Sequence, residues 1–182
     1  MEKVAVFLAE GFEEIEGLMV VDLLRRAQIA VDMVSMSENK QVTGSHQITV
    51  TADTTIGQIS FDSYDVLVLP GGMPGTNRLK ECAVLCDALT AAYKNGRKIA
   101  AICAAPTVFG KLGLLKDKKA CCYPGMEDEL YAKEVTYQPV TVDGNVTTSR
   151  GLGTALVFAL SLIEQLKGKE AADALAKKVV YE

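Results

Sequence analysis

The chain has 182 residues, of which 49% are hydrophobic and 23% are charged, and its formal net charge is −4. This composition is typical of a globular protein that can bury a core without disulfides or structural metal. It excludes disordered, collagen-like and disulfide-scaffold classes, and the negative charge argues against nucleic acid or an anionic membrane as a partner. The most hydrophobic stretches, 99–110 and 155–163, are too short to span a bilayer.

The cysteines and the single histidine indicate a reducing compartment and no metal site. The five cysteines follow no framework spacing, and the N-terminal stretch lacks the pattern of a secretory leader, so we expect a cytoplasmic location. No C-x-x-C pair is present, and His46 lies far in sequence from every cysteine. We therefore expect neither a metal nor any other cofactor. The cysteines are Cys82, Cys86, Cys103, Cys121 and Cys122.

Short apolar runs alternate with segments of helical periodicity along the chain. In order, the patterns predict a strand at 3–8, a helix at 12–27, a strand at 30–35, an edge ribbon at 42–52, a strand at 65–69, a helix at 82–93, a strand at 98–102, a hairpin within 135–149 around Asp143-Gly144, and helices at 153–166 and 169–178. Nearly all-apolar strands between helices indicate a mainly parallel sheet covered on both faces. We find no repeat or linker, and expect one α/β domain over residues 1–182.

Reactive groups in open α/β sheets lie beyond the carboxyl ends of the strands. Three segments are therefore candidates for a functional site: 9–16, 70–76 and 103–107. Each follows a predicted strand directly.

Cys103 lies where a strand turns sharply into a helix. It follows the run KIAAI and precedes Pro106, with the small residues Ala101 and Ala105 two positions to either side. This arrangement resembles a nucleophile elbow, and the start of a helix favours the thiolate. The alternative is a small core cysteine at the end of a strand.

Glu16 falls at the centre of the apolar stripe of the predicted helix 12–27, whereas Glu14 falls on the opposite, polar side. A carboxylate on a buried face is costly when ionised, so the pKa of Glu16 should rise. The alternative is a helix that begins later and leaves Glu16 in a solvated first turn.

The run Pro70-Gly71-Gly72 provides backbone amides that can stabilise an oxyanion, but it contains no phosphate-binding motif. His46 lies within the ribbon, where a lone histidine is usually structural or solvated. If it faces the site, it can bind anions or shuttle protons. We assign no role to Cys82, Cys86, Cys121 or Cys122.

Four segments together resemble the ThiJ/PfpI superfamily, and within it the branch of the parkinsonism-associated protein deglycase. The segments are AEGFEEIEGLMVVDLLRRA, DVLVLPGGMPG, AAICAAPTVFGKLGLL and TSRGLGTALVFALSLIEQLKGKEAA. The resemblance implies a flavodoxin-like three-layer sandwich of the class I glutamine-amidotransferase type, usually assembled as a homodimer.

The resemblance also implies roles for particular residues. Cys103 matches the reactive cysteine and Glu16 its protonated partner, while the backbone amides of Gly72 and Ala104 match the oxyanion site and Arg150 matches a pocket arginine. Three positions depart from the family pattern. Tyr123 stands where the branch has a histidine, His46 where it has an arginine, and Ala105 where it has a glycine.

The function implied is that of a cysteine-dependent stress-response protein acting on small reactive carbonyls, as a glutathione-independent glyoxalase or deglycase weakened by the missing histidine. The alternatives are a non-enzymatic redox sensor with an oxidisable Cys103 and a chaperone-like dimer. The family label of thiazole-monophosphate (thiamine) biosynthesis is also in use. A contact from Tyr123 or His46 to the Cys103 sulfur would favour the enzyme, and its absence would favour the sensor.

Overall fold

The computed structural model describes residues 2–181 and contains a seven-stranded sheet and two two-stranded sheets. The strands are β1 (Lys3–Leu8), β2 (Ala30–Ser35), β3 (Gln41–Thr43), β4 (Thr49–Thr51), β5 (Thr54–Thr55), β6 (Val66–Leu69), β7 (Lys98–Ile102), β8 (Lys119–Ala120), β9 (Glu134–Val135), β10 (Val140–Asp143) and β11 (Val146–Ser149). The α-helices are α1 (Glu14–Arg26), α2 (Gly75–Glu81), α3 (Ala83–Lys94), α4 (Pro106–Lys111), α5 (Ala155–Lys167) and α6 (Lys169–Lys178).

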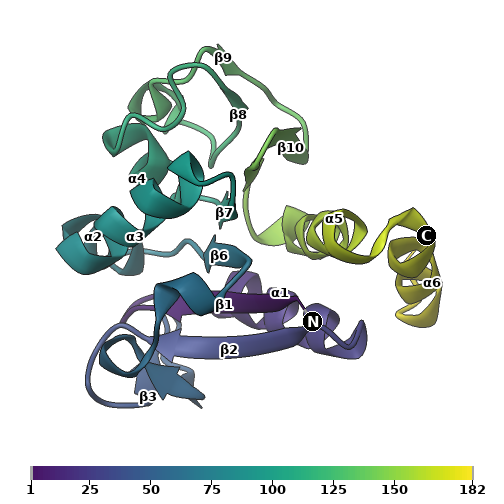
Figure 1. Ribbon diagram of the computed structural model, residues 1–182, viewed down its shortest axis with the longest axis horizontal. Coiled ribbons are helices and arrows are strands. Elements are labelled where there is room, and N and C mark those ends of the chain that lie inside the picture. Colours follow the sequence, from purple (N-terminus) through teal and green to yellow (C-terminus); the bar gives the residue numbers. More distant parts are fainter. Residues whose placement is uncertain (1, 182) are drawn as a thin grey trace.

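The main sheet has the strand order β10-β11-β7-β6-β1-β2-β5. All of its pairings are parallel except the β10–β11 hairpin, whose turn is Gly144-Asn145. This confirms the predicted α/β class and the mainly parallel sheet. The predicted ribbon is the antiparallel pair β3–β4, which forms a separate sheet. Figure 1 shows the stacked strands with helices to both sides.

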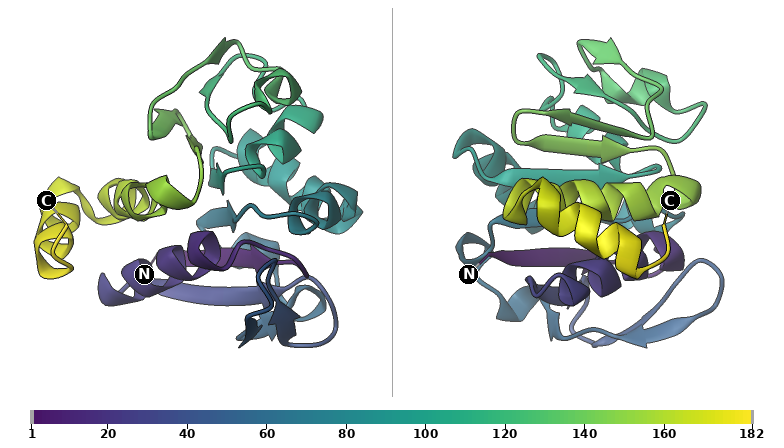
Figure 2. Two further views of the ribbon diagram at one scale, coloured as in Figure 1. Left: turned by 180° about the vertical axis from the view of Figure 1, so that it is seen from behind. Right: turned by 90° about the vertical axis from the view of Figure 1, so that its right-hand side faces the viewer.

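Alternating side chains of the strands divide the core into two layers. Val4, Val6 and Leu8 of β1 pack in the layer covered by α1, α5 and α6. Ala5 and Phe7 point to the opposite face, where α2, α3 and α4 cover the sheet. The right-hand view in Figure 2 shows α5 and α6 in front of the sheet. The result is a three-layer sandwich, in which period-two alternation assigns each strand residue to one core layer.

The structure differs from the predicted elements in several places, and it adds the short strands β5 and β8, which were not predicted. Helix α1 begins at Glu14 rather than at residue 12, because Glu13 is its N-cap. Helix α2 was not predicted, since only Gly75, Thr76 and Leu79 of its seven residues are buried and an amphipathic pattern is absent. The predicted hairpin segment 135–149 is shorter than expected: it pairs only from Val140, and Val135 belongs to β9 instead.

The strand order brings the three candidate segments to one edge of the sheet. Strands β1, β6 and β7 are neighbours and run parallel, so their carboxyl ends lie side by side. Segments 9–16, 70–76 and 103–107 follow these three strands. Strand β11 pairs with β7 and carries Arg150 to the same edge.

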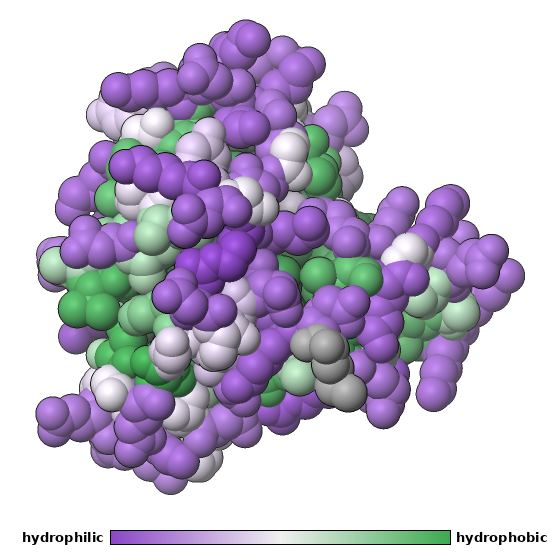
Figure 3. All heavy atoms as spheres, in the orientation of Figure 1, coloured by the Kyte–Doolittle hydropathy of each residue, from purple (hydrophilic) through white to green (hydrophobic). Residues whose placement is uncertain are grey.

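Hydrophilic residues cover most of the face seen in Figure 3, and hydrophobic residues gather there in smaller patches. This fits a chain that buries its apolar side chains in two internal layers. Within residues 2–181, no helix is both long and apolar enough to cross a membrane.

The packing of the core layer beneath α5 can be tested at Phe158, whose side chain is fully buried there. Replacing Phe158 by Ala removes a large apolar side chain and leaves a cavity, so we expect a loss of about 3–5 kcal/mol in the free energy of unfolding. Urea denaturation measures it. Val84→Ala on the exposed side of α3 is the control, with an expected change within about 0.5 kcal/mol. A loss below about 1 kcal/mol for Phe158→Ala would contradict the packing described.

Candidate active site

Cys103 occupies a strained turn between β7 and α4. Its φ angle is +66°, a value that non-glycine residues rarely adopt. Two backbone hydrogen bonds hold the turn: the N–H of Cys103 donates to the carbonyl of Ser149 at 3.0 Å, and its carbonyl accepts from the N–H of Tyr123 at 2.8 Å. The strand–turn–helix geometry confirms the predicted elbow. Such strain persists only where the surrounding structure enforces it.

Glu16 is buried beside Cys103, with 1% of its surface exposed. Its Oε2 accepts a hydrogen bond of 2.9 Å from the N–H of Gly71, and its side chain also hydrogen-bonds Cys103. Gly71 makes this approach feasible, because a Cβ atom there would lie 2.6 Å from both the Cys103 Cβ and the Glu16 Oε2. The absence of a side chain at position 71 therefore lets the thiol and the carboxyl group meet.

Burial dominates the proton affinities of this pair. It raises the pKa of Glu16 to about 7; the hydrogen bond to Cys103 opposes the rise, and the negative charge of Glu13 adds to it. Burial, the charge of Glu16 and the hydrogen bond to it raise the pKa of Cys103 to about 12. The predicted effect of the helix start on this pKa is present, but it is smaller than the effects of burial and of Glu16. The N–H groups of Ala104 and Gly72 do lower this pKa, but they are outweighed.

The first turn of α1 also corrects the helical-wheel prediction. The helix does begin later than expected, so Glu16 lies in its first turn, yet Glu16 is buried rather than solvated. Glu14, predicted on the polar side, is only 2% exposed. The wheel was wrong for Glu14 because the ribbon loop, which is distant in sequence, covers it.

The structure brings most of the predicted site residues together. The N–H groups of Gly72 and Ala104 act on the Cys103 thiol and lower its pKa, which is compatible with the oxyanion site that remains a prediction. The Tyr123 ring and the Glu16 carboxyl flank Gly151: a Cβ atom there would lie 3.5 Å from Tyr123 Cδ2 and 4.0 Å from Glu16 Oε1.

The side chains of Arg150 and His46 have contacts with groups other than the thiol. The guanidinium of Arg150 stands 5.8 Å from the ring centre of Tyr137. The Nδ1 of His46 contacts carboxylates of α1 rather than the sulfur. Among the hydrogen bonds within residues 2–181, none joins Tyr123 or His46 to the sulfur of Cys103, whose partners are Glu16 and two backbone amides. This contact set favours the sensor over any mechanism that needs a histidine.

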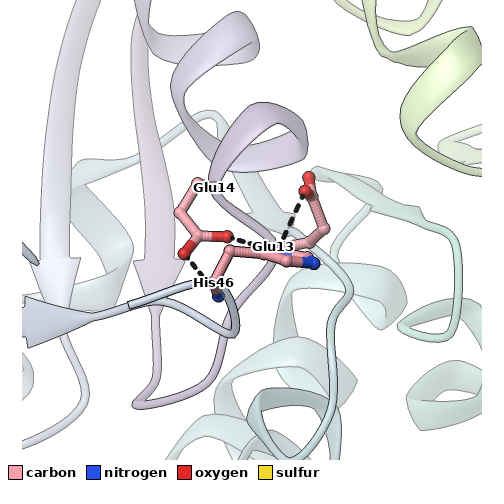
Figure 4. A group of neighbouring side chains, drawn as sticks. All are labelled: Glu13, Glu14 and His46. Atoms are coloured by element: carbon pink, nitrogen blue, oxygen red, sulfur yellow. Dashed lines mark hydrogen bonds and ion pairs between the residues drawn. The ribbon is translucent and has the colours of Figure 1, made fainter. Parts of the chain in front are cut away.

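Sequence reasoning missed a cluster formed by Glu13, Glu14 and His46, which Figure 4 shows at the start of α1. Glu14 accepts hydrogen bonds from the N–H of His46 at 2.7 Å and from its Nδ1 at 3.0 Å. Glu13 accepts one from the N–H of Glu16 at 2.8 Å. The only available signal was the run of acidic residues before the helix, which is typical of N-caps generally.

The ligand-type atoms of this cluster all lie within 4.8 Å of one another. That spacing is compatible with a cation, but both oxygens of Glu14 already accept protein hydrogen bonds, as does Glu13. The same hydrogen bonds lower the pKa of Glu14 despite its burial, which alone would raise it. We therefore interpret the cluster as a hydrogen-bonded network rather than a metal centre.

All five cysteines are free. Cys121 and Cys122 are buried, and Cys82 and Cys86 are half-buried. Burial raises the pKa of Cys122 to about 12, with a further rise from the charge of Glu127. None of these four lies in a turn like that of Cys103.

The three-layer α/β sandwich places the chain among the flavodoxin-like proteins, and the elbow cysteine at the carboxyl end of the sheet marks the position of its candidate active site. The profile of the DJ-1/PfpI family matches residues 2–165 of this chain. The chain is 41% identical to Protein dj-1beta of Drosophila melanogaster over 174 residues, which cover 94% of this chain and 93% of that protein. The chain belongs to the DJ-1/PfpI family.

Two further relatives bear on the site. The chain is 32% identical to the glutathione-independent glyoxalase DJR-1.2 of Caenorhabditis elegans, over 92% of this chain and 90% of that protein. The solved structure of oxidised Toxoplasma gondii DJ-1 superposes with a TM-score of 0.96 at 38% identity, covering 100% of this chain and 99% of that one. The fold is thus the flavodoxin-like fold of this family.

The raised pKa of Glu16 makes stability depend on pH. Between its ordinary value of 4.5 and about 7, the unfolded chain releases a proton that the folded chain keeps, so stability falls as pH rises. We expect the free energy of unfolding of the wild type to fall by roughly 2–3 kcal/mol relative to Glu16→Gln between pH 4.5 and 8. Urea denaturation across this range measures it. Parallel pH profiles of the two proteins would mean that Glu16 titrates normally.

Proposed function

We propose that the protein uses Cys103 as a nucleophile toward small reactive carbonyls, with Glu16 as the proton carrier, in glyoxalase-type chemistry without glutathione. The observation that carries the proposal is a buried carboxyl with a pKa of about 7 hydrogen-bonded to the thiol. A group that titrates near neutral pH is well matched to general acid–base catalysis, so Glu16 can supply the function of the family histidine that Tyr123 replaces.

Because the pKa of Cys103 is high, the thiol needs a base, and Glu16 is the first group to act. Free thiolate is scarce near neutral pH, so ionised Glu16 takes the thiol proton as the sulfur adds to the aldehyde carbon of methylglyoxal. The electron pair of the broken C=O π bond moves to oxygen, where the N–H groups of Gly72 and Ala104 stabilise the charge. Glu16 gives the proton back to that oxygen, which forms a hemithioacetal and restores the carboxylate.

Glu16 then moves a second proton. Its carboxylate removes the hydrogen from the former aldehyde carbon, and the proton returns to the neighbouring carbon through an enediol, which leaves a thioester on Cys103. Water cleaves the thioester, releasing lactate and restoring the thiol. The net reaction adds one water to methylglyoxal and consumes no oxidant or reductant.

The relationship to a glutathione-independent glyoxalase supports the carbonyl substrate class. The three backbone amides of the site (Gly71 on the carboxyl group, Gly72 and Ala104 on the sulfur) support an arrangement built for one small electrophile. Deglycation of thiols or amines would use the same first step.

Cys103→Ala tests this function. We expect the wild type to convert methylglyoxal to lactate without glutathione, and Cys103→Ala to lose this activity; Glu16→Gln should lose 10²–10⁴-fold in kcat/KM because the proton carrier is gone. Lactate formation measures both. Cys82→Ala removes another half-buried thiol and should retain full activity. Equal rates for the wild type and Cys103→Ala would refute the proposal.

Oxidation of Cys103 is the second candidate, favoured by the contact set of the sulfur. Two peroxide molecules convert the thiol to a sulfinic acid and yield two waters. Protonated Glu16 and the amides of Gly72 and Ala104 can donate hydrogen bonds to the new oxygens. The oxidised state of the Toxoplasma gondii relative supports this reading. A chaperone-like dimer, with Cys103 incidental, remains the third hypothesis.

Mild peroxide treatment followed by peptide mass spectrometry tests the second candidate. We expect addition of two oxygens at Cys103 before any other cysteine, because the Glu16 carboxyl group and two N–H groups can stabilise the product there, whereas Cys121 and Cys122 are buried. Cys86 in the same sample is an internal control, since it is half-buried and its thiol lies against backbone carbonyls. Similar oxidation of all five cysteines would refute a sensor.

The remaining expectations stay predictions. A homodimer, a cytoplasmic location and a single domain over residues 1–182 accompany either function. Five free cysteines support a reducing compartment. Thiazole chemistry has no support in the site.

A further inference from the structure

The carboxylate of Glu13 connects the start of α1 to the reactive pair. As the N-cap, Glu13 accepts a hydrogen bond from the N–H of Glu16 through its Oε2, and its own N–H donates to the carbonyl of Gly71 at 2.8 Å. Its side chain is only 11% exposed. Glu13 is therefore attached to the two residues that define the environment of Cys103, and its charge acts on Glu16 through a medium that screens poorly.

The other oxygen of Glu13 faces the ribbon. Its Oε1 lies 3.9 Å from the Nδ1 of His46, which hydrogen-bonds Glu14 at 3.0 Å. The imidazole itself is 70% exposed. Gly44 closes the loop over Glu14, because a Cβ atom there would lie 2.3 Å from the Glu14 carboxyl group. The loop thus holds a solvent-exposed imidazole against two buried carboxylates.

These contacts lead from the solvent-exposed His46 through the carboxylates of Glu13 and Glu14 toward the reactive pair (Figure 4 shows the outer part). The step from Glu13 to Glu16 is a hydrogen bond from the backbone N–H of Glu16, so Glu13 acts on the Glu16 carboxyl group through its charge. A positive charge on His46 weakens the repulsion between Glu13 and Glu16, and a neutral imidazole leaves that repulsion in place.

We propose that Glu13 is a positioning residue that keeps the shared proton on the Glu16–Cys103 pair, and that His46 tunes this effect from the solvent side. The inference rests on the proposed roles of Cys103 and Glu16 and adds control of that pair by a cluster of its own. It also gives the single histidine a role at a distance from the sulfur.

Other charged groups surround the cluster and set the background for its effect. Glu10 precedes α1, and its Oε1 accepts a hydrogen bond from the N–H of Thr43. Arg78 of α2 lines one cavity together with Glu10 and Ser45. Among the described residues, the further titratable or charged groups near the cluster are Glu16 on α1, Glu10 and Arg78 in the cavity lined by Gly44 and Ser45, and Cys103 beside Glu16.

The test is the pH dependence of Cys103 alkylation by iodoacetamide in the full-length protein, followed on the Cys103 peptide by mass spectrometry. Removing the charge with Glu13→Gln should make the pair release its proton more readily. We expect the midpoint of the profile to move to lower pH by about half a unit, with a roughly threefold faster reaction on its rising limb. The Gln oxygen still accepts from the N–H of Glu16, so the N-cap is kept.

Two sets of controls separate charge from structure. Asp22→Asn removes the same charge from the exposed side of α1, where Asp22 pairs with Arg26, and should leave the midpoint unchanged. His46→Arg fixes a positive charge beside Glu13, and His46→Gln removes it. The midpoint of His46→Arg should therefore lie below that of His46→Gln.

Three outcomes would overturn the inference. A midpoint that moves in Glu13→Ala but not in Glu13→Gln would mean that Glu13 acts only as an N-cap. Unchanged midpoints in Glu13→Gln, together with a shifted one in Glu16→Gln, would leave the proposed function standing without the inference. Slower alkylation with micromolar Zn²⁺ in the wild type, but not in His46→Gln, would make the cluster a cation site. An ordinary profile insensitive to Glu16→Gln would instead refute the proposed function itself.

Discussion

The contact between the Glu16 carboxyl group and the Cys103 thiol is the constraint on which the rest of the site depends. Two acidic groups meet in a largely buried space, so neither ionises at its usual pH and the charge of one opposes that of the other. The strained turn at Cys103 aims the sulfur at this contact, and the N–H of Gly71 fixes the carboxyl group. Reactivity then depends on where one proton resides.

Two carboxyl groups in the first turn of α1 have pKa values shifted in opposite directions. Glu14 has several N–H donors from the ribbon loop, which hold its pKa below the ordinary value, whereas Glu16 has one N–H donor and a thiol, and its pKa rises. Environments that move the pKa values of two carboxyl groups apart commonly define acid–base roles in enzymes. Here the two pKa values differ because a different strand end or loop covers each side chain, since both are almost fully buried.

Much of the fold and part of the site followed from local patterns. The parallel sheet was predictable because its central strands β1, β6 and β7 are nearly all apolar, and the burial of Glu16 because it interrupts an apolar stripe. The burial of Glu14 was not, because the group that covers it, the loop at Gly44, is distant in sequence. The rise in the pKa of Cys103 was not predictable for a similar reason. The helix start is visible in the sequence, whereas the burial of the thiol and the nearby Glu16 carboxyl group, which outweigh it, are properties of the folded chain.

Gly44 and Gly71 differ in the substitutions that the surrounding structure allows at their positions. Neither has the positive φ that usually reserves a position for glycine. Gly44 is small because Glu14 occupies the space its side chain would need, whereas a side chain at Gly71 would also meet the Cys103 Cβ and the carbonyl of Ile102. Loss of Glu14 would free position 44 to accept larger residues, so the substitutions tolerated there are a record of whether that acidic group is still in place. Position 71 would stay closed even without Glu16, because the strand end and the elbow fill the same space.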